Sequence, residues 1–289
     1  MTSPDLLVIG GGSAGLSAAR TARALNRSVA IVNDGPPGGD CTFTGCVPSK
    51  TLLSAGSLTF TDAMARVRAT IASIAADEDV AALTDEGIDV VLGRAVVQSP
   101  NRVEVHGTVL RPRKILIATG ARPQIPLIPG LSEIPYLTTD TLFDLEVLPD
   151  HLVIVGVGPI GVEMAAAFRQ FGANVTTIEA ADRLIGREEP RASRVITQVL
   201  RRSGVTVKTS TAASSVSLTD DDIQLTLAED TLSASHLLIA TGRQPNLSRL
   251  DALGLALTDQ KAIRTNLKMQ TSDSSIYAAG DVTGRSAFT

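Results

Sequence analysis

The segment Asp5-Leu6-Leu7-Val8-Ile9-Gly10-Gly11-Gly12-Ser13-Ala14-Gly15 is a short apolar run that ends in a glycine-rich loop. A segment rich in Ala, Leu and Arg, with the composition of a helix, follows it. Glycines at this spacing permit a tight turn, close approach of the backbone to a pyrophosphate, and close packing of a helix on a strand. The segment therefore predicts a strand, a phosphate-binding turn and a helix. The alternative is an ordinary glycine turn between a strand and a helix.

The chain contains this pattern a second time. The run from Leu152 ends in Gly156-Val157-Gly158-Pro159-Ile160-Gly161, and another Ala-rich segment follows. In each copy a polar residue lies 23 positions after the first glycine, at Asn33 and at Glu179. Each half closes on Ala-Thr-Gly, at 118–120 and 240–242. Two copies in matching context favour nucleotide binding over ordinary turns.

We therefore expect an α/β protein with two doubly wound Rossmann-like nucleotide-binding domains, the second inserted into the first. The expected ranges are 1–147 for the first domain, 148–243 for the inserted domain, and 244–289 for the return to the first. The chain has 289 residues, enough for about two domains.

The composition narrows the function classes. The net charge is −4 and aromatic residues make up 3%, which argues against binding of nucleic acids. No apolar run approaches the roughly 20 residues that span a bilayer, so no membrane partner is expected. The N-terminus shows no basic segment followed by a long apolar one, and we expect a cytoplasmic location.

The two cysteines of the chain lie in Gly38-Gly39-Asp40-Cys41-Thr42-Phe43-Thr44-Gly45-Cys46-Val47-Pro48-Ser49-Lys50. In a reducing compartment such a pair favours a redox function over a structural disulfide, and a pair of inert buried thiols is the alternative. Pro48 suits the first turn of a helix, which places Cys46 near a helix N-terminus where a thiolate is stabilised. Cys41 is expected on the loop side, where it is more open to a substrate.

Together these segments resemble the class I pyridine nucleotide-disulfide oxidoreductases, the flavoprotein family of dihydrolipoyl dehydrogenase, glutathione reductase and mercuric reductase. The resemblance rests on 39–50, both glycine loops, both Ala-Thr-Gly closures and Ala279-Gly280-Asp281, and it covers essentially the whole chain. It implies FAD in the first domain and NADH in the second. Electrons would pass from NADH through the flavin to Cys46, then through Cys41 to a small-molecule or protein disulfide or a related acceptor.

The resemblance also implies roles for individual residues. Cys41, Cys46, Lys50 and Glu163 would be catalytic, with Lys50 beside the isoalloxazine and paired with Glu163; a solvated helical charge is the alternative for Glu163. The expected FAD contacts are Gly10, Gly12, Ser13, Ala14, Gly15, Asn33, Asp34, Gly39, Lys50, Thr119, Gly120 and Asp281. The expected NAD contacts are Gly156, Gly158, Ile160, Gly161, Glu179 and Gly242. No metal site is expected.

Two positions bear on cofactor choice. Glu179 would accept a hydrogen bond from a ribose 2′-hydroxyl and repel a 2′-phosphate, which favours NADH over NADPH, although Arg183 and Arg187 could soften this preference. Asn33 stands where the family usually has an FAD-binding acid, and Asp34 follows it. We therefore expect weakened FAD binding.

The chain stops at Thr289, where the family continues into an interface domain that forms a dimer and supplies a His-Glu pair. We expect a truncated form with impaired turnover that does not form the family-type dimer, with a natural short form as the alternative. We expect His106, His151 and His236 to be surface or loop residues. Two other functions stay open: an NADH diaphorase or oxidase that does not use the cysteines, and a non-catalytic nucleotide-binding fragment.

Overall fold

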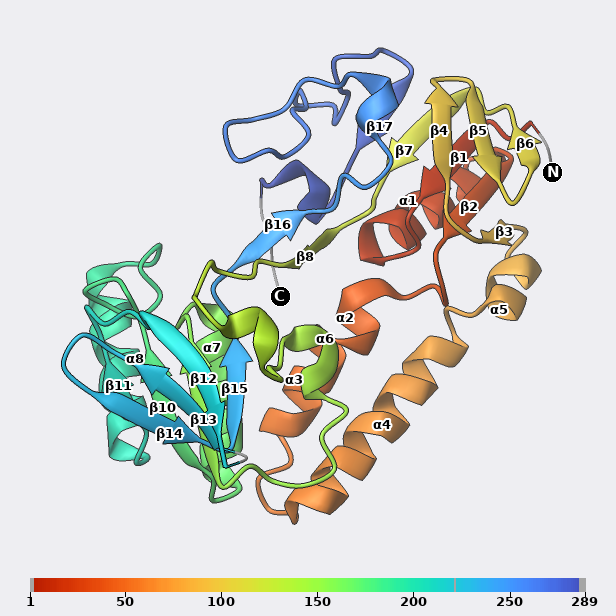
Figure 1. Cartoon of the computed structure of the whole chain (residues 1–289). Coiled ribbons are helices and arrows are strands. Elements are labelled where there is room, and N and C mark those ends of the chain that lie inside the picture. Colours follow the sequence, from red (N-terminus) through yellow and green to blue (C-terminus); the bar gives the residue numbers. More distant parts are fainter. Residues whose placement is uncertain (1–2, 221, 286–289) are drawn as a thin grey trace. The chain divides into compact units, whose positions relative to one another are not determined.

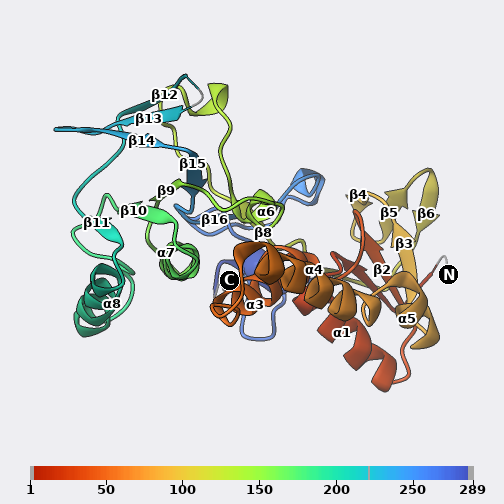
Figure 2. The ribbon, with the colours of Figure 1, turned by 90° about the horizontal axis from the view of Figure 1, so that it is seen from below.

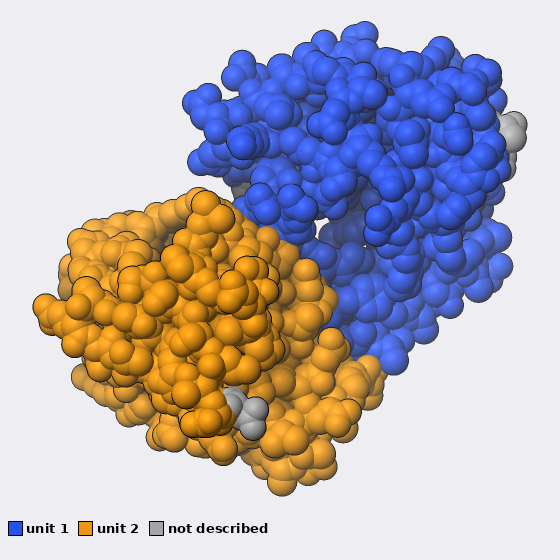
Figure 3. Space-filling model, in the orientation of Figure 1, with its two compact units in different colours: residues 1–43, 71–122, 243–288 blue, residues 44–70, 123–242, 289 orange. Residues whose placement is uncertain are grey.

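The structure is a computed structural model that describes residues 3–220 and 222–285 (Figure 1). The chain divides into two compact units, which Figure 3 distinguishes by colour. Unit 1 contains the described residues of 1–43, 71–122 and 243–288, and unit 2 contains 44–70 and 123–242. Unit 1 is thus interrupted twice by segments of unit 2.

Unit 1 is built on a five-stranded parallel sheet with the spatial order β17-β7-β1-β2-β3. Its strands are β17 (Ile276–Ala278), β7 (Lys114–Ile117), β1 (Leu6–Ile9), β2 (Val29–Asn33) and β3 (Asp89–Leu92). Because side chains alternate along a strand, Leu7 and Ile9 of the central β1 join one buried cluster and Val8 joins another. Both faces of the sheet are therefore covered.

The two faces of this sheet have different covers. Helix α1 (Ser13–Ala24) packs on the Val8 side, where Leu16 and Ala19 are buried, and the other side carries a small antiparallel sheet (Figure 2). The antiparallel strands are β4 (Val96–Ser99), β5 (Arg102–Val105) and β6 (Thr108–Leu110). Unit 1 also contains α2 (Gly39–Phe43), α5 (Val80–Asp85) and the short 3₁₀ helices η2 (Asp251–Leu253) and η3 (Asp281–Thr283).

Unit 2 repeats the parallel arrangement with four strands in the order β11-β10-β9-β15. These are β11 (Thr206–Lys208), β10 (Asn174–Ile178), β9 (His151–Val155) and β15 (His236–Ile239). An antiparallel sheet of β12 (Ser215–Thr219), β13 (Asp222–Thr226) and β14 (Thr231–Ala234) shares a buried cluster with it. The helices are α3 (Cys46–Leu53), η1 (Leu131–Glu133), α6 (Thr139–Leu142), α7 (Pro159–Gln170) and α8 (Pro190–Arg202).

Over its described residues the chain passes between the units four times: after Phe43, within α4 (Phe60–Ala76), within β8 (Ala121–Pro123) and directly before β16 (Arg243–Pro245). The first turns of α4 belong to unit 2, where the ring of Phe60 lies 5.8 Å from Phe168 and 5.7 Å from Phe171. These aromatic contacts explain why residues 44–70 pack with unit 2, although they precede most of unit 1 in the sequence.

The fold expected from the sequence is confirmed: each glycine loop joins a parallel strand to a helix, and the second parallel sheet is inserted in the chain of the first. The two compact units are defined by the packing of the chain. The ranges 1–147, 148–243 and 244–289 are instead the segments that the sequence assigns to the binding of FAD or NAD. That assignment of ranges to cofactors stays a prediction. In the part of the chain that the structure describes, no helix combines the length and apolar character needed to cross a membrane.

Candidate functional site

In the first glycine loop, the fold requires glycine at two positions but not at the third. Gly10 has a positive φ of 107°, and a Cβ there would lie 2.2 Å from the Ala118 carbonyl oxygen. A Cβ on Gly15 would lie 2.0 Å from the oxygen of Gly10. At Gly12 the φ is −83°, and the nearest atom to an added Cβ would be Gly39 Cα at 3.7 Å, an ordinary contact. The fold therefore tolerates a side chain at Gly12, and its absence leaves the N-terminus of α1 accessible.

The second loop shows the same division. A Cβ on Gly156 would lie 2.6 Å from the oxygen of Ala240, and one on Gly161 would lie 2.2 Å from the oxygen of Gly156. Nothing lies within 4 Å of a Cβ added to Gly158. Neither α1 nor α7 has an acidic residue in its first turn or a side-chain cap. Both helix N-termini therefore favour an anion that approaches the middle glycine.

Asn33, at the end of β2, is held by its own loop. Its Oδ1 accepts a hydrogen bond from the Gly11 amide at 2.7 Å, and its Nδ2 donates to the carbonyls of Gly35 and Pro36, each at 3.0 Å. Asp34 is exposed and forms an ion pair with Arg94. The structure thus gives both candidate ribose-binding side chains partners within unit 1.

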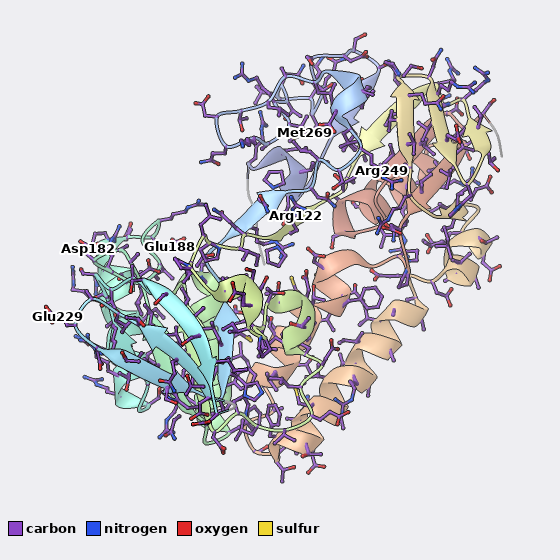
Figure 4. The ribbon with its side chains drawn as sticks, in the orientation of Figure 1. Arg122, Asp182, Glu188, Glu229, Arg249 and Met269 are labelled. Carbon is purple, nitrogen blue, oxygen red and sulfur yellow. The ribbon has the colours of Figure 1, made fainter. Side chains whose placement is uncertain are left out.

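Glu179 occupies the equivalent position after β10. Its carboxylate accepts hydrogen bonds from the Val157 amide at 2.8 Å and the Ala181 amide at 3.0 Å. In the loop that follows, where Figure 4 labels Asp182 and Glu188, the Arg183 guanidinium donates to the carbonyls of Gly186 and Glu188. Arg183 is thus engaged by its own loop.

The first part of the cysteine segment lies on the first glycine loop. The Gly38 amide donates to the Gly11 carbonyl at 2.7 Å, and a Cβ on Gly39 would lie 2.7 Å from Gly12 Cα. Cys41 lies in the short helix α2 rather than in the loop that we expected, because Gly39 begins a helical turn here. The buried Thr42 donates to Glu78 at 2.8 Å. Residues 38–42 are therefore held by these contacts within unit 1.

Cys46 is the first residue of α3, which confirms its expected place at a helix N-terminus. Gly45 precedes it without a side-chain cap, and Pro48 is buried in the first turn. The helix dipole and its free amides stabilise a thiolate at such a position. Cys41 and Cys46 are both half-buried, so exposure alone does not distinguish the two thiols.

Lys50 and Glu163 join α3 to α7 within unit 2. Lys50 Nζ lies 2.6 and 2.7 Å from the two carboxylate oxygens of Glu163. Glu163 is therefore paired rather than solvated, as the resemblance implied. Two turns further along α7, Gln170 donates to the carbonyl of Leu52 at 3.1 Å, at the end of α3. The two helices are thus fixed at both ends of their contact.

A small hollow of about 10 Å³, roughly the room that one water molecule needs, adjoins this ion pair in unit 2. Its lining combines residues from the start of α3, from α6 and from the start of α7: Thr44, Gly45, Ser49, Thr139, Phe143, Ile160, Glu163 and Met164. Two of the predicted site residues, Ile160 and Glu163, face it.

Asp281 begins η3 directly after Gly280, whose φ is 79°. A Cβ on Gly280 would lie 3.0 Å from Ala14 Cβ, so Asp281 is one residue from a contact with the first turn of α1. Arg243, a residue we did not predict, lies between Asp281 and Asp40 with its side chain only 7% exposed. The one signal for it in the sequence was its position directly after the second Ala-Thr-Gly closure.

The two closures make matching hydrogen bonds. Thr119 donates to the carbonyl of Asn246, whose amide donates to Gly120. In the other half Thr241 donates to the carbonyl of Gln124, whose amide donates to Gly242. Thr119, Gly120 and Gly242 therefore have roles in the backbone of the closures, in addition to any contact with a cofactor.

The histidines differ from the expectation in part. His151 and His236 are the first residues of β9 and β15 and are half-buried, whereas His106 lies in the turn between β5 and β6. Burial lowers the pKa of His236, an effect that the charge of Asp150 opposes. Across 3–220 and 222–285, no group of three or more His, Cys, Asp and Glu side chains is arranged to hold a metal ion.

Two parallel α/β units, each with a glycine-rich turn between a strand and a helix, and a cysteine-containing segment whose Gly38 and Gly39 lie against the first of these turns are typical of nucleotide-dependent oxidoreductases. The matches to known proteins agree with this class. The chain belongs to the pyridine nucleotide-disulphide oxidoreductase family, whose model matches residues 4–289.

Three relatives are similar to this chain over nearly all of its length. The chain is 33% identical to the mercuric reductase of Bacillus cereus, over 96% of this chain and 48% of that protein. It is also 33% identical to the dihydrolipoyl dehydrogenase of Bacillus subtilis, over 98% of this chain and 68% of that one. The HOCl-induced flavoprotein disulfide reductase RclA of Escherichia coli, solved as a Cu(II) complex, superimposes with a TM-score of 0.94 at 31% identity. That match covers all of this chain and 68% of RclA, so the chain spans about half to two thirds of its relatives.

Proposed function

We propose that this chain binds FAD at the first glycine loop and NADH at the second, and that it transfers electrons to a Cys41–Cys46 disulfide and on to a disulfide or related acceptor. The names of the relatives, which include mercuric reductase and a flavoprotein disulfide reductase, support this class of reaction. In this proposal 1–147 and 244–289 serve FAD, and 148–243 serve the pyridine nucleotide.

One observation carries the proposal. The segment that holds Cys41 contacts the middle glycine of the first loop through Gly38 and Gly39, so a thiol and a phosphate-binding turn belong to one packed unit. A structural thiol pair has no need of a nucleotide site beside it. A redox pair does, because its electrons must come from a carrier.

The residues present fit FAD. Gly12 lacks a side chain where the fold would accept one, and the buried Nε of Arg243 has no hydrogen-bond partner among the described residues. Both features suit a diphosphate at the N-terminus of α1. When bound, FAD would supply a two-electron carrier between nicotinamide and disulfide. The expected contribution of Asn33 is to orient the loop through Gly11.

The residues of the chain have distinct proposed roles. Reduction of the disulfide consumes the hydride of NADH and one proton from solvent, and yields NAD⁺ and two thiols. The N-terminus of α3 would stabilise the Cys46 thiolate, which leaves Cys41 for exchange with the acceptor. Lys50 would be held by Glu163 so that its charge faces the reaction centre.

We infer a preference for NADH from Glu179. Its two backbone hydrogen bonds hold a carboxylate at the end of β10, where it would accept from a ribose 2′-hydroxyl and repel a 2′-phosphate. Arg183, whose positive charge would offset that repulsion, donates instead to carbonyls of its own loop. This engagement of Arg183 supports the inference.

The test is an anaerobic titration of the FAD-loaded protein with NADH, followed by thiol counting with a chromogenic disulfide reagent. Wild type should bleach the flavin and gain two thiols, whereas Cys41→Ser should bleach but gain no thiol pair. Bleaching with no gain of thiols in wild type, and a full rate of dye reduction in Cys41→Ser, would identify a diaphorase. Absence of bleaching in wild type would identify a non-catalytic nucleotide-binding fragment.

A further inference from the structure

Arg243 is a buried arginine held between two carboxylates of unit 1. Its Nη2 donates to the Ala121 carbonyl at 2.8 Å and to the carboxylate of Asp40. Its Nε lies 3.7 Å from Asp281 Oδ2, which is close enough for an ion pair but too long for a hydrogen bond. Within the described residues this buried Nε has no hydrogen-bond acceptor. A guanidinium in this state retains the capacity to bind a further anion.

This cluster adjoins the N-terminus of α1. Asp40 directly follows Gly39, where an added Cβ would lie 2.7 Å from Gly12 Cα, and Asp281 directly follows Gly280, where an added Cβ would lie 3.0 Å from Ala14 Cβ. Both acids are thus one residue from a glycine that closely approaches the start of α1. The positive end of the helix attracts a diphosphate, whereas the Asp40 carboxylate already occupies part of the Arg243 guanidinium that a diphosphate would use.

The two carboxylates are not equivalent. The side chain of Asp40 is 50% exposed, and that of Asp281 is 22% exposed. Asp40 is the more exposed of the two, so water solvates its carboxylate more fully when it separates from Arg243. Breaking this ion pair therefore costs less free energy than breaking the pair with Asp281. Asp40 is therefore the partner that Arg243 can exchange.

We propose that Asp40 is an internal competitor for Arg243: its carboxylate occupies a guanidinium that would otherwise bind the diphosphate of FAD, and so it weakens FAD binding. This inference rests on the proposed function. Arg243 exchanges the carboxylate of Asp40 for a phosphate oxygen, and no covalent bond forms or breaks. Since Cys41 follows Asp40 in the chain, the exchange also couples FAD binding to the position of the cysteine segment.

The experiment measures the dissociation constant of FAD from the apoprotein by flavin fluorescence quenching. Asp40→Asn should tighten binding about tenfold, the equivalent of about 1.4 kcal/mol, and Arg243→Gln should weaken it by a similar factor. In the Arg243→Gln background, Asp40→Asn should change affinity less than about threefold, because the competition is already lost. Glu86→Gln removes one negative charge from an exposed ion pair with Arg20 in the same unit and should leave affinity unchanged.

A second measurement does not depend on the flavin. Inorganic pyrophosphate should raise the Tm of the Asp40→Asn apoprotein more than that of wild type, which gives a readout even if one variant loses FAD through altered folding. Weaker or unchanged FAD binding in Asp40→Asn, or a gain that persists without Arg243, would overturn the inference.

Gly12→Ala distinguishes this inference from the proposed function. It should weaken FAD binding without unfolding the apoprotein, because only Gly39 Cα lies near the added Cβ. If wild type failed to bind FAD, or if Gly12→Ala bound it equally well, the proposed FAD site would fail, and the competition would fail with it. A normal Gly12→Ala effect with no Asp40→Asn effect would refute the competition alone.

Discussion

Asn33 and Glu179 accept the same hydrogen bond in the two halves of the chain, from the amide that follows the first glycine of each loop. The distances are 2.7 Å from Gly11 and 2.8 Å from Val157. Beyond this shared bond they differ: Asn33 donates to two carbonyls, whereas Glu179 accepts from a second amide. One position therefore shapes a loop in unit 1, and its counterpart presents a carboxylate in unit 2.

Asn33→Asp should destabilise unit 1. A carboxylate can still accept from Gly11, but it cannot donate to Gly35 and Pro36, whose carbonyls would then face a negative charge. We expect a loss of about 1–3 kcal/mol in the free energy of unfolding, measured by urea denaturation. Unchanged stability would show that solvent replaces the two donor bonds without cost.

Glu179→Gln should shift the preference between pyridine nucleotides. Without the negative charge, the ratio of kcat/KM for NADH to that for NADPH should fall about tenfold, or about 1.4 kcal/mol. Asp182→Asn, which removes a charge from the loop after β10, is the matched control and should leave the ratio unchanged. An equal shift in both variants would point to net charge rather than to recognition of the ribose.

Gly158→Ala should weaken NADH binding without harming the fold, because nothing lies within 4 Å of the added Cβ. We expect the dissociation constant to rise about tenfold or more, since the methyl group occupies space that a pyrophosphate needs. Gly161→Ala should impair folding, with its Cβ 2.2 Å from the Gly156 oxygen, and Gly186→Ala should be silent. Equal NADH binding by Gly158→Ala and wild type in isothermal titration would contradict a nucleotide site at this loop.

Lys50→Met should slow reduction of the bound flavin by NADH about tenfold or more, because a positive charge aimed at the reaction centre is lost. Its effect on stability should stay below about 1 kcal/mol, since the side chains of Lys50 and Glu163 are 52% and 30% exposed. Arg20→Met, in an ion pair of similar exposure with Glu86, should leave the rate of reduction unchanged. Stopped-flow absorbance measures the rate, and a normal rate in Lys50→Met would remove this residue from the proposed mechanism.

His236 should make unit 2 sensitive to mild acid. Its pKa in the folded chain is lowered from 6.5 by burial, so the unfolded chain binds a proton more readily. The stabilising contribution is full above pH 6.5 and is lost as the pH falls toward the folded pKa. Urea midpoints at several pH values should therefore fall more steeply below pH 6.5 in wild type than in His236→Gln. Parallel curves for the two proteins would contradict this assignment.

Much of the site could be predicted because it depends on local backbone requirements. Gly10 and Gly156 need positive φ angles, and Pro48 marks the first turn of the helix that Cys46 begins. These requirements appear in the sequence as residue types at short, repeated spacings. The contact between Lys50 and Glu163, 113 positions apart, was foreseen only through the family resemblance.

The sequence by itself determined the two strand-turn-helix units, and the polar residue that follows each loop at the same spacing, Asn33 in one half and Glu179 in the other. It could do so because neighbouring residues decide φ angles, turns and helix starts. Only the tertiary structure decided that 44–70 pack with unit 2, and that Arg243 binds Asp40 across 203 positions of the chain. Such contacts depend on how distant segments fit together, and a buried guanidinium selects its carboxylates by position in space rather than by any pattern along the chain.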